Sequence, residues 1–64
     1  MIRQVPAEEI KVGDFIIPEP GGMPRAVTQV RRGGGGDVYV VYAVGGLMEK
    51  MPPMHPHQPV EVEQ

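Results

Sequence analysis

The sequence predicts an all-β domain, a small barrel of five short strands with one N-terminal helical turn. Apart from Pro6 and Gly13, the 9 glycines and 8 prolines are clustered in four blocks, at residues 18–24, 33–36, 45–46 and 52–59. The apolar residues lie between these blocks in short runs rich in β-branched side chains, which is the pattern of strands separated by turns. A chain of 64 residues forms one domain, residues 1–64, and it has no cysteine to cross-link it.

The first expected elements are the helical turn and a short strand. Residues 5–10 place a proline and two glutamates where a first helical turn and the helix dipole favour them. The apolar run 15–17 is expected to be the first strand of the barrel. Pro18 ends this strand because proline has no N–H to donate to a neighbouring strand.

The second strand is expected at residues 25–32 and leads into a glycine-rich hairpin tip. Val27 and Val30 are out of strict alternation, and one bulged residue between them would reconcile the pattern. Residues 33–36 are four consecutive glycines, which accept the backbone conformations that a tight hairpin tip requires.

The third strand, residues 37–44, is the clearest in the chain, and both of its faces are apolar. Gly45-Gly46 then has the composition of a two-residue turn, so residues 47–51 are expected to pair with the third strand as the fourth. Period-two alternation places Val38, Val40, Tyr42 and Val44 on one face and Tyr39, Val41 and Ala43 on the other.

The C-terminal part of the chain is expected to be an extended connector followed by the fifth strand. Residues 52–59 include four prolines, which exclude a regular helix or a central strand. Residues 59–63 alternate apolar and acidic side chains, as a half-exposed strand does.

The order of these parts resembles that of the SH3-like small β-barrels. The resemblance covers nearly the whole chain and implies architecture, whereas the Trp with which SH3 domains bind proline-rich peptides is missing here. The residues that carry it are Val12-Gly13-Asp14-x-Ile16, the long loop after the first strand, Val27-x-x-Val30, the hairpin at 33–36 and the closing Pro59-Val60-x-Val62.

The composition argues against an enzyme. The chain has no Ser and no Cys, and Thr28 is its only aliphatic hydroxyl, so a base-activated Ser or Cys nucleophile is excluded. We therefore expect no catalytic residues and no cofactor. The apolar runs are far shorter than the ~20 residues of a membrane span, and the first residues have no apolar signal core, so a cytoplasmic protein without membrane contact is expected.

The second apolar face of the third strand has to contact the far wall of the barrel, the proline-rich segment or another protein chain. We expect a non-enzymatic binding or adaptor module that acts through protein contacts, with a partner or with itself. Such a small module would suit an accessory protein of a phage or mobile element. The expected contact residues are Tyr39, Val41 and Ala43, with Arg31 and Arg32 at the rim.

One alternative is nucleic-acid binding near the glycine tip. Arg25, Arg31 and Arg32 could contact phosphates while Tyr42 stacks on a base. The net charge of −2 opposes this alternative, because phosphate contacts require a basic face.

A second alternative is copper binding by Met51, Met54, His55 and His57, since thioether and imidazole groups together suit copper. In the competing interpretation, which we favour, the sequence holds no metal site. Leu47, Met48 or Met51 then packs in the core, and the two histidines are solvated on the connector.

Overall fold

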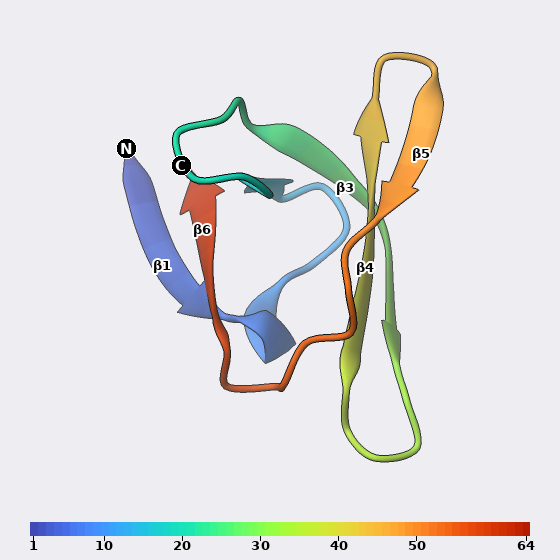
Figure 1. The fold of residues 1–64 in the computed structure, drawn as a ribbon. Helices are drawn as coiled ribbons and strands as arrows, with labels where there is room; N and C mark the ends of the chain where they lie inside the picture. The colour runs from blue at the N-terminus through green and yellow to red at the C-terminus, as the bar shows by residue number, and fades with distance from the viewer.

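The structure is a computed structural model that describes residues 1–64. Its strands form one antiparallel sheet in the order β1-β6-β2-β3-β4-β5 (Figure 1). β1 and β5 are the two edges of this sheet, and they do not pair with each other. The elements are β1 (Ile2–Pro6), the 3-10 turn η1 (Ala7–Glu9), β2 (Phe15–Ile16), β3 (Arg25–Arg32), β4 (Val38–Val44), β5 (Leu47–Lys50) and β6 (Pro59–Glu63).

The predicted all-β class is confirmed, but the sheet has six strands rather than five. The additional strand is β1, which pairs with β6 from Ile2 opposite Glu63 to Pro6 opposite Pro59. The sheet is not closed, so the expected barrel is not confirmed. The five predicted strands are all present, with ends that differ by one residue at most.

The predicted helical turn is shorter than expected and is a 3-10 turn. Pro6 precedes it in an extended conformation, and the Ile10 N–H donates to the Ala7 carbonyl at 3.2 Å. The Ala7 N–H donates to Gln58 at 2.9 Å, which fixes the turn to the proline-rich segment. No helix of the chain is long and apolar enough to cross a membrane.

The core lies on one side of the sheet, which we call the inner side. The proline-rich segment covers part of it, because Met54 is only 2% exposed and exchanges two backbone hydrogen bonds with Val38, at 2.8 and 3.0 Å. The segment predicted to be a plain connector therefore also contributes to the core. The buried residues are all apolar: Ala7, Ile10, Ile16, Ile17, Val27, Val38, Val40, Met54, Val60 and Val62.

Two hairpins arrange β3, β4 and β5. The predicted bulge in β3 is confirmed, because the pairing with β4 shifts between Val27 and Gln29. The predicted pairing of β4 with β5 is also confirmed, with Val44 opposite Leu47 across a two-residue turn. Gly45 has φ +60° in this turn, a conformation that residues with a Cβ rarely adopt.

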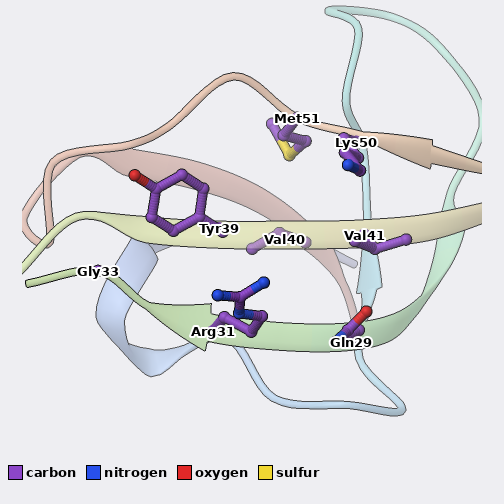
Figure 2. Close-up of a pocket in the computed structure, with 8 residues that line it drawn as sticks. All are labelled: Gln29, Arg31, Gly33, Tyr39, Val40, Val41, Lys50 and Met51. Atoms are coloured by element: carbon purple, nitrogen blue, oxygen red, sulfur yellow. The ribbon is translucent and has the colours of Figure 1, made fainter.

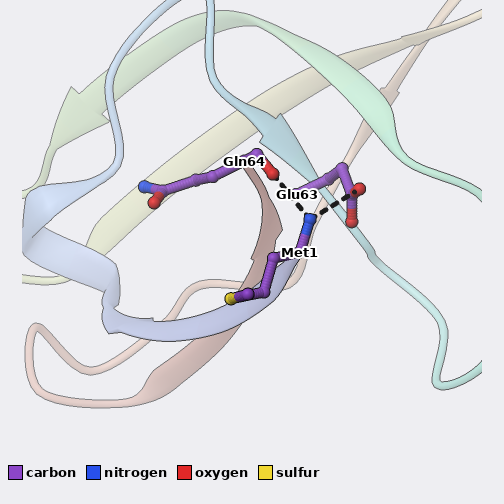
Figure 3. A network of polar contacts seen from close by, with 3 residues as sticks. All are labelled: Met1, Glu63 and Gln64. Carbon is purple, nitrogen blue, oxygen red and sulfur yellow. Dashed lines mark hydrogen bonds and ion pairs between the residues drawn. The ribbon is translucent and has the colours of Figure 1, made fainter.

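The two chain ends lie side by side at the β1–β6 edge (Figures 1 and 3). The amino group of Met1 donates to the Gln64 carbonyl at 2.6 Å and to Glu63 Oε1 at 3.1 Å. These contacts are exposed, so water and salt weaken them, and β1 is held mainly by its backbone pairing with β6.

Candidate functional site

The two faces of β4 differ sharply in burial. Val38 and Val40 point into the core and are 0% and 1% exposed. On the opposite face Tyr39 is 39% exposed, and Val41 and Ala43 are half-buried. The second apolar face of this strand is therefore open to solvent, and neither a far wall nor the proline-rich segment covers it.

The neighbouring strands extend this face on both sides. In the β3–β4 pair, Arg31 lies opposite Tyr39 and Gln29 lies opposite Val41. In the β4–β5 pair, Lys50 lies opposite Val41 and Met48 lies opposite Ala43. Directly opposed residues share a face of a sheet. We call this surface the outer face; it consists of Gln29, Arg31, Tyr39, Val41, Ala43, Met48 and Lys50.

A hollow of about 450 Å³ lies in the outer face (Figure 2). Four of its eight lining residues are hydrophobic, and its only charged side chains are those of Arg31 and Lys50. No carboxylate lines it. The lining residues are Gln29, Arg31, Gly33, Tyr39, Val40, Val41, Lys50 and Met51.

The position of the Tyr39 ring depends on Gly33. A Cβ built on Gly33 would lie 2.8 Å from Tyr39 Cε2 and 3.4 Å from the Tyr39 hydroxyl oxygen. The ring therefore lies directly over the backbone at Gly33, at a distance that only a glycine permits. The sequence predicted a turn role for this glycine, whereas the structure adds a packing role beside the hollow.

The two cations of the outer face have no ion-pair partner in the chain. The ion pairs of the structure join the Met1 amino group to Glu63 and His57 to Glu8, at 3.1 and 4.0 Å. Arg31 and Lys50 are both exposed. The hollow is thus an apolar surface beside two uncompensated positive charges, which favours a ligand that combines an apolar group with an acidic one.

The structure brings four of the five expected contact residues together and separates the fifth. Tyr39, Val41, Ala43 and Arg31 lie on the outer face. Arg32 lies on the inner side, because neighbouring residues of a strand point to opposite faces. Its Nη2 donates to the Glu8 carbonyl at 3.1 Å, which links the end of β3 to η1.

The residues of the nucleic-acid alternative do not share one surface. Arg25 lies opposite the buried Ile16, and Tyr42 packs against the core, so both belong to the inner side with Arg32. Only Arg31 reaches the outer face. The three arginines therefore do not form a continuous row of cations on one face.

The residues of the copper alternative divide between the core and the surface. Met54 is buried in the core, and Met51 is half-buried and packs against it. The exposed rings of His55 and His57 are 5.5 Å apart, and His55 Nδ1 accepts a hydrogen bond from the His57 backbone N–H at 3.2 Å. No group of three or more His, Cys, Asp or Glu residues is placed to hold a metal ion.

Lys50, Gln29 and Met48 are outer-face residues that the sequence reasoning missed. Their signal was present in the turn at Gly45-Gly46, because a two-residue turn fixes the register and places Lys50 opposite Val41. Gln29 required knowledge of the exact position of the bulge.

The fold and this face define a small all-β protein with an exposed apolar and basic sheet surface. No protein-family model, curated protein or solved structure matches the chain. The outer face is therefore the feature of the molecule from which a function can be inferred.

Proposed function

We propose that this protein is a small, non-enzymatic binding module with an SH3-like arrangement of strands, which contacts a protein partner through the outer face of β3, β4 and β5. The observation that carries the proposal is the 39% exposed Tyr39 at the edge of an apolar hollow of about 450 Å³. Half-exposed tyrosines beside apolar surface are typical anchors of protein interfaces.

The outer-face residues divide into an apolar centre and a polar rim. Tyr39 is the anchor, because its ring is held over Gly33 and so loses little freedom on binding. Val41 and Ala43 supply further apolar contact area next to it. Arg31 and Lys50 orient the partner, since exposed charges at a rim contribute more to orientation and association rate than to affinity.

A protein partner fits this face better than a nucleic acid. A polynucleotide needs a row of cations that follows its phosphates. The outer face has two cations, Arg31 and Lys50, while Arg25 and Arg32 lie on the inner side and the net charge is −2. Two positive charges beside an apolar surface match one or two carboxylates of a protein.

The test compares partner capture by outer-face variants with capture by a matched control. Tyr39→Ser and Val41→Glu change the outer face, whereas Met23→Ser removes a more exposed apolar side chain from the loop between β2 and β3. We expect the unaltered protein and Met23→Ser to capture the same partner, and both outer-face variants to fail to capture it. The purified partner should then bind directly to the unaltered protein.

A second measurement, sedimentation of the purified chain at high concentration, tests for self-association. A dimer that Val41→Glu dissociates would make the partner a second copy of the chain. Equal capture by all variants, with a monomeric chain, would refute the assignment of the outer face.

A further inference from the structure

The outer face is bordered by an unpaired strand edge. β5 pairs with β4 on one side only and is the last strand of the sheet, and all four of its residues are exposed. An edge strand presents backbone N–H and C=O groups to which another extended chain can pair.

The hydrogen bonds show which backbone groups of β5 are free. The Met51 N–H donates to the Val40 carbonyl at 2.9 Å, so Met51, just after the end of β5, directs its backbone groups toward β4. Hydrogen-bonding direction alternates along an antiparallel strand. Glu49 and Leu47 therefore also face β4, whereas Met48 and Lys50 direct their N–H and C=O groups outward.

The free backbone groups lie beside the hollow. Met48 and Lys50 carry their side chains on the outer face, where Lys50 lines the hollow. A strand added along β5 would place alternate side chains over this surface. Pro52 and Pro53 lie one residue beyond the end of β5 and have no N–H to offer, so the added segment is short.

We propose that the partner of this protein is an acidic, extended protein segment that adds to the sheet along β5. Its backbone pairs with Met48 and Lys50, one carboxylate lies between Lys50 and Arg31, and one apolar or aromatic side chain enters the hollow beside Tyr39. The proposal rests on the proposed function and names the partner's chemistry.

The charges of the two sheet edges favour this edge for an acidic partner. The β5 edge adjoins a hollow that has two unpaired cations and no carboxylate. At the other edge, the outer side of the sheet beside β1 carries Glu61 opposite Gln4, a carboxylate without an ion-pair partner that would repel an acidic segment.

The test is an NMR titration of the ¹⁵N-labelled chain with two pools of end-blocked heptapeptides. The acidic pool has Glu and an apolar or aromatic residue two positions apart, so that both side chains lie on the same face of an added strand, and the control pool has Gln in place of Glu. With the acidic pool we expect shifts at Tyr39, Val41, Met48 and Lys50, and at saturation at least tenfold slower hydrogen exchange of the Met48 and Lys50 amides.

Two sets of variants separate the contributions of charge and backbone. Arg31→Gln with Lys50→Gln is expected to weaken binding about five- to thirtyfold, the range of one to two kcal/mol, while Lys11→Gln has no effect. Met48→Pro removes an N–H that points outward and makes no hydrogen bond to β4. This variant is expected to bind the acidic peptides more weakly than Met48→Ala does. The exchange measurement on the unaltered chain decides the point if Met48→Pro does not fold.

The outcomes separate the two proposals. Equal binding of both pools refutes the acidic partner. Shifts at Tyr39 and Val41 with unchanged exchange at Met48 and Lys50 refute strand addition but leave the outer face as a binding site. No shift at millimolar peptide refutes the partner class, although capture that depends on Tyr39 would still support the proposed function. Oligonucleotide binding at Tyr39 and Arg31 overturns both.

Discussion

Replacing Gly33 with alanine tests whether the outer face depends on the contact between this glycine and Tyr39. The added Cβ would lie 2.8 Å from Tyr39 Cε2, whereas carbon atoms pack without repulsion at about 3.5–4.0 Å. The ring must therefore move by about 1 Å. Tyr39 is 39% exposed, so the ring has solvent to move into and the backbone can stay in place.

The expected change in folding stability is small, because two effects oppose each other. Holding the Tyr39 side chain away from its preferred rotamer costs about 0.5–1.5 kcal/mol. The φ of Gly33 is not positive, so alanine fits the backbone and gains about 0.4–1 kcal/mol through lower entropy of the unfolded chain. The net change lies within about 1 kcal/mol, or about 4–8 °C in Tm for a domain of this size.

The assay combines thermal unfolding with NMR of the Tyr39 ring. Gly34→Ala is the matched control, since its Cβ would meet no atom within 4 Å and its φ is not positive. We expect Gly33→Ala to shift the Tyr39 ring resonances while Gly34→Ala leaves them unchanged. Unchanged Tyr39 resonances in Gly33→Ala, or a fall in Tm well beyond 8 °C, would refute the reasoning.

Three further substitutions test the fold. Met54→Ala is expected to destabilise the domain by about 2–5 kcal/mol, measured by urea unfolding, because it leaves a cavity in the core, whereas Met23→Ala should have almost no effect. Gly45→Ala forces a Cβ into φ +60° and should cost about 1–2 kcal/mol more than Gly46→Ala, whose φ is not positive; equal values would contradict the turn geometry. Asp14→Ala removes the acceptor of the Lys11 N–H, at 2.9 Å, and is expected to cost about 1 kcal/mol in the same assay, while Asp14→Asn retains most of that stability.

The sequence was sufficient to predict those strands whose signals are local. Gly45-Gly46 marked the β4–β5 turn, and the spacing of Val27 and Val30 indicated the bulge in β3. β1 was missed because its pairing with β6 joins the two ends of the chain, and no local pattern reports a contact of that separation. Within β1, only Val5 and Pro6 belong to the predicted helical turn, and no element is predicted for residues 2–4.

The composition of the outer face was predicted in part for the same reason. Alternation along β4 correctly grouped Tyr39 with Val41 and Ala43. Arg31 and Arg32 were expected together because they are neighbours in sequence, but a strand separates neighbours onto opposite faces. Lys50 lies on the outer face because β5 pairs with β4 and places it opposite Val41.

The meeting of the two chain ends has a practical consequence. Met1 and Gln64 are hydrogen-bonded at the β1–β6 edge, and β5 forms the opposite edge of the sheet. A tag or a surface attached at either end would therefore leave the hollow accessible. A linker of a few residues could also join the ends into a cyclic chain, or allow new ends to be opened in a surface loop, with little change to the sheet.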